Sequence, residues 1–290
     1  MRKLKTKMMT DNDALEISQL YLYPIKSLGG IPVGEAWLEK RGFRHDRRLM
    51  LVDPQGHFYT QRTLPRMALL QPEIRASDLL VRHRQFPDQS VTLPWLPGPE
   101  CPRMTVQIWE DTVEAAVYPS TINDWFSRQL DRSVYLVALP DDSHRPVDPA
   151  YAETTDEVSF ADGFPYLIAT EASLADLNRR LKTPVPMLRF RPNIVLSGPW
   201  APWDEDHWLG FRLGRHSFRS TKPCGRCEVV TIDPQTAVRS GEPLRTLSGF
   251  RQKGHHILFG LNACWAQEPK PAVLRIGDAF DLTDRRPAQT

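Results

Sequence analysis

The chain has 290 residues, a formal net charge of +2 at pH 7 and a mean hydropathy of −0.42. A chain of this length buries a sizeable core in one large or two ordinary domains. The nearly balanced charge gives no reason to expect nucleic acid or a membrane surface as a partner. No apolar run reaches the ~18 residues that a membrane-spanning helix needs. The first 13 residues also lack the apolar region of an export signal.

The first half of the chain is predicted to form short strands. Alternating apolar residues predict a strand over 15–23, and a second strand follows over 33–38. A hairpin is expected where 48–52 and 57–60 flank the turn Asp53-Pro54-Gln55-Gly56. Further strands are predicted over 74–76, 79–83, 91–93, 104–108 and 113–117.

The second half adds helices to this pattern. A helix is predicted over 120–130 with Ser120 as its cap, and another from Thr170 through Leu181. The stretch 139–149 is the most loop-like part of the chain. Further strands are expected over 134–138, 166–169, 194–196, 207–213, 217–220, 258–264 and 274–280. Two helices among a dozen or so short strands predict a β-rich, barrel-like α+β protein.

The stretch 221–227 carries two thiols three positions apart, Cys224 and Cys227. They lie between Lys222 and Arg226, and neighbouring cations favour the thiolate, the form that acts as a nucleophile or metal ligand. The Val/Thr/Ile residues over 229–232 predict a strand directly after them. We therefore expect both thiols in a loop at the start of a strand.

Four interpretations of this cysteine pair stay open. A structural zinc site would recruit His255, His256 or Cys264 as further ligands. A thioredoxin-like redox pair should open a helix, which the predicted strand opposes. The cysteines could also be buried without chemistry. We favour the fourth, a single thiolate that binds a soft metal or bears a persulfide. Only four cysteines occur in the chain, which excludes a disulfide scaffold and indicates reduced thiols in the cytoplasm.

A set of cations and hydroxyls lies in or beside loops that adjoin the predicted strands. Its members are Lys26, Ser27, Arg47, Arg62, Arg189, Arg191 and Arg226. Together they suit a phosphate or another anionic ligand, although each taken singly fits a solvated surface residue. Asn193 adds the donors and acceptors that a heterocycle would use. The turn Asp162-Gly163-Phe164-Pro165 could bring backbone amides close to a ligand or be an ordinary tight turn. Thr170 and Ser173 are expected to cap a helix rather than to bind an anion.

Four motifs occur in the order found in MOSC proteins, and the chain resembles this family over roughly residues 15–283. They are Tyr23-Pro24-Ile25-Lys26-Ser27, His45-Asp46-Arg47, Phe190-Arg191-Pro192-Asn193-Ile194-Val195 and Pro223-Cys224-Gly225-Arg226-Cys227. The family joins an N-terminal β-barrel domain to a molybdenum cofactor sulfurase C-terminal domain. It includes the mitochondrial amidoxime-reducing component and bacterial relatives that detoxify N-hydroxylated bases. The resemblance implies domains over 14–131 and 132–285 with a cofactor cleft between them.

The resemblance also implies site residues. Cys227 would be the protein ligand to molybdenum in a pterin-dithiolene molybdenum cofactor. The pterin and its phosphate would be held by Lys26, Ser27, Arg47, Arg191 and Asn193. Gly163 and Phe164 would contribute through their backbone. Gly225 and Arg226 would flank the metal ligand, and Asn262 would face the cofactor.

The activity implied is a molybdenum-dependent reduction of N-hydroxylated small molecules, N–OH to N–H, with no role for pyridoxal phosphate. No cluster-binding cysteines follow residue 280, so a separate ferredoxin- or flavin-reductase-like protein is expected to supply the electrons. The membrane anchor of the mitochondrial members is not expected here. An alternative is a carrier that holds sulfur or the cofactor on Cys227, and a third possibility is a β-rich binding module with an empty cleft.

Overall fold

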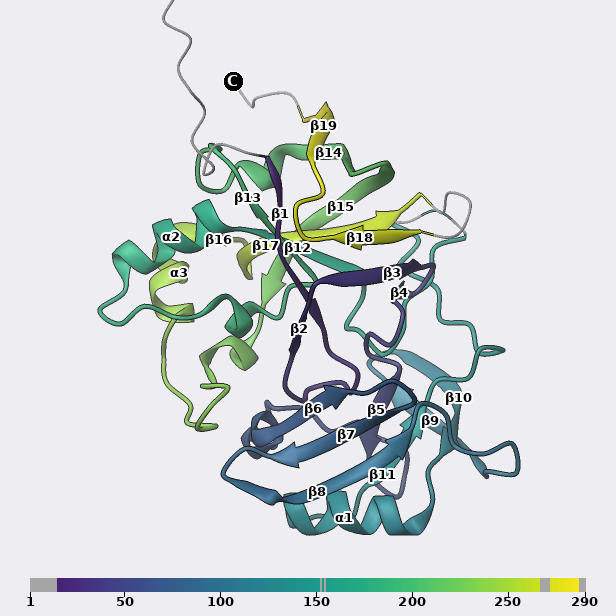
Figure 1. The fold of residues 1–290 in the computed structure, drawn as a ribbon. Coiled ribbons are helices and arrows are strands. Elements are labelled where there is room, and N and C mark those ends of the chain that lie inside the picture. Colours follow the sequence, from purple (N-terminus) through teal and green to yellow (C-terminus); the bar gives the residue numbers. More distant parts are fainter. Residues whose placement is uncertain (1–14, 152, 154, 267–271, 287–290) are drawn as a thin grey trace, which may run out of the picture.

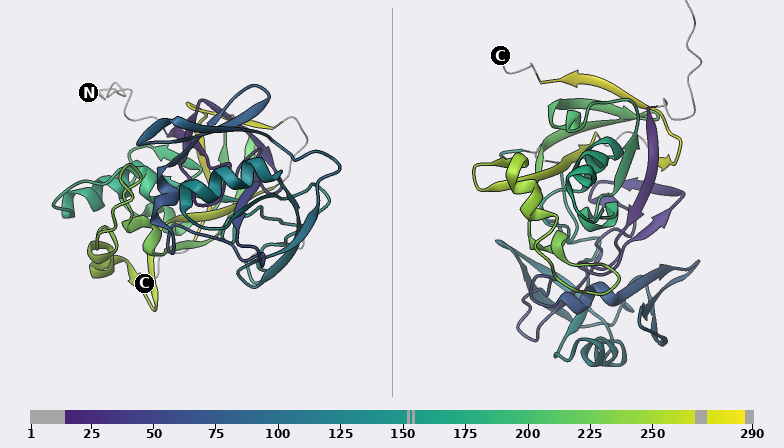
Figure 2. Two further views of the ribbon diagram at one scale, coloured as in Figure 1. Left: turned by 90° about the horizontal axis from the view of Figure 1, so that it is seen from below. Right: turned by 90° about the vertical axis from the view of Figure 1, so that its left-hand side faces the viewer.

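A computed structural model describes residues 15–151, 153, 155–266 and 272–286 (Figure 1). The first 13 residues, where no export signal is expected, lie outside this part. Strands dominate the described residues, and they gather in two bodies that lie one above the other (Figure 1; Figure 2, right). The β-rich α+β class is therefore confirmed.

The upper body is built on a nine-stranded sheet with the order β19-β14-β15-β17-β12-β13-β1-β2, and β16 pairs with β17. Its strands are β1 (Glu16–Leu22), β2 (Ile31–Val33), β12 (Tyr166–Thr170), β13 (Ile194–Ser197), β14 (Trp208–Leu213), β15 (His216–Arg226), β16 (Gln252–Lys253), β17 (His256–Trp265) and β19 (Phe280–Arg285). A small sheet joins β18 (Val273–Arg275), β3 (Glu35–Glu39) and β4 (Gly42–Phe43). The helices α2 (Glu171–Arg180) and α3 (Leu244–Arg251) lie on one side of the upper body (Figure 1).

The lower body contains two antiparallel sheets and one α-helix. One sheet has the order β5 (Leu49–Val52), β11 (Tyr135–Ala138), β10 (Asp111–Val117), β9 (Arg103–Ile108). The other joins β6 (Leu70–Ile74), β7 (Asp78–His83) and β8 (Phe86–Pro94). Helix α1 (Ser120–Leu130) lies beneath them in Figure 1. Short 3-10 turns occur at Pro65–Leu69, Met187–Phe190, Asp204–His207 and Glu228–Thr231.

The chain passes between the two bodies more than once, so that neither body is a single continuous segment. The first strand, β1, pairs with β13 of the upper body, with Leu20 opposite Ile194. Conversely, β11 lies beyond residue 131 but pairs with β5 of the lower body. The predicted division into 14–131 and 132–285 stays a prediction, and the strand pairing crosses it in both directions.

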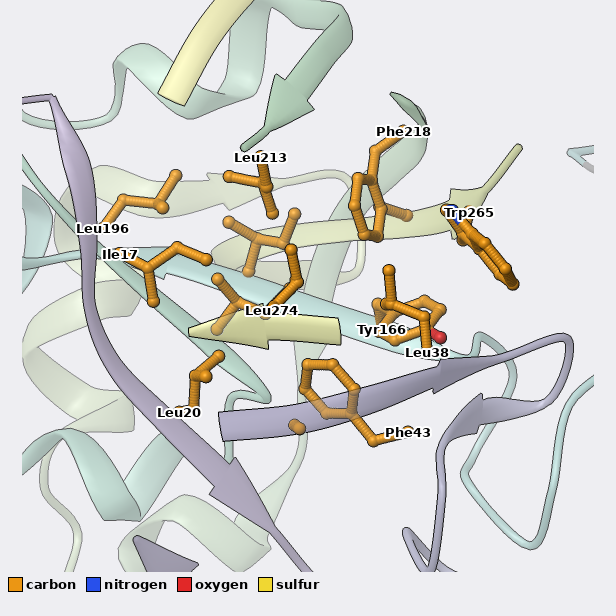
Figure 3. Packing of buried hydrophobic residues seen from close by; sticks show 14 of the residues in the cluster. Ile17, Leu20, Leu38, Phe43, Tyr166, Leu196, Leu213, Phe218, Trp265 and Leu274 are labelled. Carbon is orange, nitrogen blue, oxygen red and sulfur yellow. The ribbon is translucent and has the colours of Figure 1, made fainter. Parts of the chain in front are cut away.

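The core of the upper body is built from the inward-facing side chains of its strands, and an irregularity of β1 between Ile17 and Gln19 brings Ile17 and Leu20 to the same face although they are three positions apart. Ile17 and Leu20 of β1 meet Tyr166 and Leu196 of neighbouring strands in one buried cluster (Figure 3). Aromatic rings fill much of the remaining space, and Phe211 stacks on Phe218 with centroids 5.6 Å apart. Such contacts add to the large apolar area that each ring buries.

Helix α1 has the predicted bounds, but its predicted cap is wrong. Ser120 is the first helical residue, and Pro119 precedes it without any side-chain hydrogen bond to the helix. The helix is held by its apolar face, on which Trp125, Phe126 and Leu130 are buried. The cap predicted for α2 is confirmed, because the Thr170 hydroxyl accepts a hydrogen bond from the Ser173 amide at 3.2 Å.

Two other elements differ from the prediction. Residues 57–60 form no strand and contribute only two isolated bridges, one between Val52 and Phe58 and one between His57 and Gln107. Helix α3 was missed, because its sequence contains Ser248 and Gly249, which favour helix weakly. Burial of Leu247 supplies the stabilisation that the weak helix preference of these residues does not. The predicted turn at Asp53 has a counterpart at Asp233, where the sequence Asp-Pro-Gln recurs. In both turns the aspartate carboxylate accepts a hydrogen bond from the backbone amide of the glutamine two positions later.

The predicted strand after the cysteines is wrong. Residues 221–226 are themselves the end of β15, where Arg226 pairs with Ile257 of β17. The chain then turns into the short 3-10 helix Glu228–Thr231, in which the Thr231 hydroxyl bonds the Glu228 carbonyl at 2.7 Å. Sheet pairing therefore uses the residues before Cys227, and burial of Val230 in the turn outweighs its preference for a strand.

Candidate functional site

A cleft with a volume of about 120 Å3 opens where loops enter and leave the strands of the upper body. It gathers nearly all of the residues predicted for the site. Those lining it are Lys26, Ser27, Arg47, Gly163, Phe164, Arg191, Asn193, Arg226, Cys227 and Asn262. Gly225 lies between two lining residues without lining the cleft itself. The sequence had not singled out Ala161, Leu167, Phe190 or Val229, which complete the wall with Asp162 and Cys224.

The backbone of the cleft is unusual at three of these residues. Ser27, Arg47 and Arg191 have positive φ angles of 66°, 47° and 54°. Residues other than glycine adopt this left-handed conformation at a cost, and such costs concentrate at functional sites. Hydrogen bonds hold the conformation: the Arg47 amide donates to the Tyr23 carbonyl at 2.8 Å, and the Ser27 carbonyl accepts from the Gln61 side chain at 2.6 Å.

Two of the cations lie on one buried aromatic ring. The guanidinium carbons of Arg47 and Arg191 lie 4.2 and 4.3 Å from the centroid of Tyr23. Stacking of this kind fixes the planes of both groups. Burial, and then the nearby charge of Arg47, lowers the pKa of Arg191 to about 10, so Arg191 stays charged at neutral pH. The buried Tyr23 hydroxyl has no hydrogen-bond partner among the described residues.

Asn193 acts within the protein rather than facing a ligand. Its side-chain oxygen accepts bonds from the Arg47 guanidinium at 3.1 Å and from the Leu167 amide at 3.2 Å. Its side-chain nitrogen donates to the Tyr21 carbonyl at 3.4 Å. Asn193 therefore braces Arg47 against β1 and β12. The donors and acceptors that the sequence suggested for a heterocycle are engaged in these bonds.

Lys26 is buried and makes two close contacts. Its ammonium donates to the Phe160 carbonyl at 2.8 Å and to the Asp162 carboxylate at 2.5 Å. Burial lowers the pKa of Lys26, and the charge of Asp162 works against that shift. The Asp162 side chain is 70% exposed, and the charges of Lys26 and Arg47 hold its pKa well below the usual range. The cleft thus contains an ion pair that the sequence did not reveal, since the partners are 136 positions apart.

The two thiols have different surroundings. Cys227 is exposed in the cleft, and its sulfur forms no hydrogen bond with another described residue. Cys224 is half-buried, and the Arg226 guanidinium donates to its sulfur at 2.9 Å. The Lys222 ammonium lies over two aromatic rings, 3.8 Å from the centroid of Tyr151 and 5.4 Å from that of Phe164. Arg226 is therefore the cation that bonds directly to Cys224.

Two of the predicted cations lie outside the cleft. Arg62 stacks on Trp109, with 4.4 Å between the guanidinium carbon and the ring centroid. Arg189 pairs with Asp233 at 3.0 Å and lines a separate cavity. Thr170 and Ser173 are also remote from the cleft, and their hydroxyls bond the buried carboxylate of Glu205.

The alternatives for the cysteines can now be compared with their placement. In the described part of the chain, no group of three or more His, Cys, Asp or Glu side chains is placed to hold a metal ion. Cys264 is buried beside Asp156, away from the pair, and burial raises the pKa of its thiol to about 12. Cys224 lies within β15, two residues before its end, and opens no α-helix, unlike a thioredoxin-like pair. Both thiols line the cationic cleft, and Cys227 is the more exposed of the two.

The cleft also contains polar groups that lack partners. The Nε atom of Arg226 is buried without a hydrogen bond, and the backbone amides from Ala161 to Phe164 donate to no other described residue. A Cβ added to Gly163 would meet no atom within 4 Å, so space remains above that residue. An anionic ligand with several acceptor oxygens and a soft atom for the thiol matches this set of groups. The fold and cleft thus define a β-rich protein with a cationic cleft that holds the exposed thiol of Cys227.

Family models and relatives agree with this class. The chain matches the MOSC N-terminal beta barrel domain over residues 14–133 and the MOSC domain over residues 155–281. It is 32% identical to mitochondrial amidoxime-reducing component 1 of Xenopus laevis, over 93% of this chain and 82% of the relative. It is 30% identical to the Homo sapiens protein of the same name, over 92% and 82%. The chain belongs to the MOSC family and shares its N-terminal β-barrel domain.

A second kind of relative is longer. The chain is 29% identical to a molybdenum cofactor sulfurase of Oryza sativa subsp. japonica, over 85% of this chain. It spans only 32% of that relative's length. No helix in the described residues is long and apolar enough to cross a membrane.

Proposed function

We propose that the protein is a molybdenum cofactor-dependent oxidoreductase that reduces N-hydroxylated compounds, N–OH to N–H, and so detoxifies them. The observation that carries this proposal is the exposed thiol of Cys227 in a cleft that also gathers Lys26, Arg47 and Arg191. A pterin-dithiolene cofactor needs a cationic wall for its phosphate and one thiolate for its soft metal. The amidoxime-reducing components among the relatives support the same activity.

The cleft residues divide into groups with separate roles in this proposal. Lys26, Ser27, Arg47 and Arg191 would bind the phosphate and pterin, and the backbone of Gly163 and Phe164 would donate to its oxygens. Cys227 would be the metal ligand. When bound, the cofactor supplies the two-electron redox chemistry, while the protein supplies position and electrostatics.

The remaining site residues hold or flank these groups. Asn193 keeps Arg47 in place through the bond described above. Arg226 ties the turn that carries Cys227 to the rest of the cleft, since its second guanidinium nitrogen donates to the Phe190 carbonyl at 2.8 Å. Gly225 allows β15 to pass close to His256, whose Nδ1 would lie 3.2 Å from an added Cβ. The side chain of Asn262 bonds no other described residue, which leaves its amide for the cofactor or substrate.

The proposal includes a separate electron-donor protein, ferredoxin- or flavin-reductase-like, and a small-molecule substrate that enters through the open cleft. It also places the protein in the cytoplasm. All four cysteines are unpaired in the structure, which agrees with a reducing compartment.

The second candidate function is a carrier that holds sulfur or the cofactor on Cys227. The similarity to a molybdenum cofactor sulfurase favours this alternative. The exposure of Cys227 suits it as well, because a partner could reach the sulfur directly.

Turnover distinguishes the two candidates. Protein from a cofactor-competent host would be assayed with a reduced viologen as electron source and an arylamidoxime as substrate. We expect amidine formation by the wild type and a loss of at least about a hundredfold in Cys227→Ser. A molybdenum-loaded wild type that forms no amidine, yet passes sulfur or cofactor to an acceptor through Cys227, would instead establish the carrier.

A further inference from the structure

One loop of the cleft is held from behind by two buried cations. Four consecutive carbonyls, from Ser159 to Asp162, each accept a hydrogen bond from a charged side chain. The Arg145 guanidinium donates to the carbonyls of Ser159 at 2.8 Å, Ala161 at 2.5 Å and Asp162 at 3.3 Å. The Lys26 ammonium donates to that of Phe160. Arg145 is itself only 3% exposed, and Asp111 anchors its Nε at 2.6 Å.

Planarity of the peptide bond turns this arrangement into a constraint on the amides. In a trans peptide the C=O of one residue and the N–H of the next point in opposite directions. Because the carbonyls of Ala161 and Asp162 point at Arg145, the amides of Asp162 and Gly163 point away from it. Arg145 does not line the cleft, whereas Ala161, Asp162 and Gly163 do. The side of the loop away from Arg145 is therefore the side that faces the cleft.

We propose that Arg145 is a positioning residue that turns the Asp162 and Gly163 amides toward the cleft, where they bind the anionic phosphate of the cofactor. This inference rests on the proposed function. The positive charge of Arg145 stabilises the carbonyl oxygens on one side of the loop. The amides on the opposite side carry a partial positive charge, which attracts an anion. The nearby Asp162 carboxylate is already engaged by Lys26 and by the Trp109 indole at 3.4 Å.

Arg41 provides a matched control within the same chain. Its guanidinium also forks onto two backbone carbonyls, those of Pro140 at 3.0 Å and Asp141 at 2.6 Å. Arg41 is 9% exposed, so it is comparably buried. The loop that Arg41 holds in this way, at Pro140 and Asp141, does not line the cleft. Loss of either arginine should lower stability, but only loss of Arg145 should change anion binding.

The test is a titration of inorganic phosphate into the full-length chain prepared without the cofactor. The backbone amide resonances of Asp162 and Gly163 would be followed by nitrogen-15 NMR. We expect both resonances to shift in the wild type. Arg145→Met should weaken phosphate binding about tenfold, as when one amide contact to the phosphate is lost. Arg145→Lys keeps the positive charge but not the several hydrogen bonds of the guanidinium, so its phosphate affinity should lie between those of the wild type and Arg145→Met. Because it keeps the buried charge, it provides a variant that folds. Arg41→Met should bind like the wild type.

Two results would overturn the inference. One is a wild type whose Asp162 and Gly163 resonances do not respond to phosphate. The other is an Arg145→Met or Arg145→Lys variant with wild-type phosphate affinity and only a lowered melting temperature, because that outcome leaves Arg145 a structural role alone. The test is separate from the proposed function, since amidine formation by the loaded wild type decides that function while phosphate binding decides the role of Arg145.

Discussion

The core of the upper body and the cleft beside it are built from the same strands but obey different rules. In the core, apolar side chains of several strands pack against one another (Figure 3). Phe211 stacks there on two other aromatic rings. In the cleft, Ser27 and Arg191 take left-handed backbone conformations, and Arg226 buries a nitrogen without a partner. The core is held by the packing of apolar side chains, whereas the cleft combines left-handed backbone with unsatisfied donors, a combination that is typical of ligand sites.

The largest effect on stability should come from the core. Phe211 is fully buried and stacks on both Phe218 and Phe280. We expect Phe211→Ala to lower the free energy of unfolding by about 3–5 kcal/mol, as measured by denaturant titration. Molybdenum per folded molecule should stay at the wild-type ratio. A folded variant that has lost its molybdenum would show that core and cleft are not separable.

Glu205 is a polar exception within the upper body, and its charge should make stability depend on pH. Burial raises the pKa of its carboxyl from 4.5 to about 7. The protonated carboxyl therefore makes its full contribution to the free energy of unfolding below pH 4.5, and this contribution is lost as the pH rises through 7. Glu205→Gln avoids this loss and should be more stable than the wild type above pH 7, by at most about 3 kcal/mol. Thermal melts from pH 4 to pH 8 would measure it; parallel curves for the two proteins would contradict the account.

Arg191 should affect binding more than stability. Its φ of 54° suits glycine, which offsets part of the loss of the Arg191 bond to the Leu28 carbonyl at 2.6 Å, so Arg191→Gly should lower the free energy of unfolding by no more than about 2 kcal/mol. The same change removes a buried cation from the cleft, and molybdenum retention should fall about tenfold or more. Metal analysis after gel filtration would measure the retention. Retained molybdenum with lost stability would reverse the assigned role.

Tyr23 should give the smallest effect. Its hydroxyl is buried without a partner, so Tyr23→Phe should change stability by less than about 1 kcal/mol. The ring that supports Arg47 and Arg191 is preserved. A substantial loss of molybdenum in this variant would mean that the hydroxyl reaches the cofactor, and a chemical denaturation curve alongside would exclude unfolding as the cause.

Short motifs made much of the cleft predictable from the sequence. Lys26 and Ser27, or Arg226 and Cys227, are neighbours in the chain, so recognising one identifies the other. Asp162 and Arg145 were not recognised in this way. Each acts on a partner that lies far away in sequence or on backbone atoms, and neither arrangement leaves a pattern of residue types. Arg145 even lies in the stretch predicted to be the most loop-like.

The fold shows the same limit. Helix α1 and most strands were predictable because their apolar residues repeat with the period of the element. The strand predicted over 229–232 failed because β15 pairs with β17 through Arg226 and uses the extended segment before Cys227. Helix α3 was missed because its stability comes from the burial of Leu247 rather than from its own residues.

The most direct test of the account is the ratio of molybdenum to protein in three preparations from a cofactor-competent host. These are the wild type, Cys227→Ser and Cys224→Ser. Cys227 is exposed in the cleft, whereas the Cys224 sulfur is held by Arg226. We predict near-stoichiometric molybdenum in the wild type and in Cys224→Ser, and its loss in Cys227→Ser. Zinc or no metal in the wild type, or equal molybdenum in all three proteins, would contradict the assignment of Cys227.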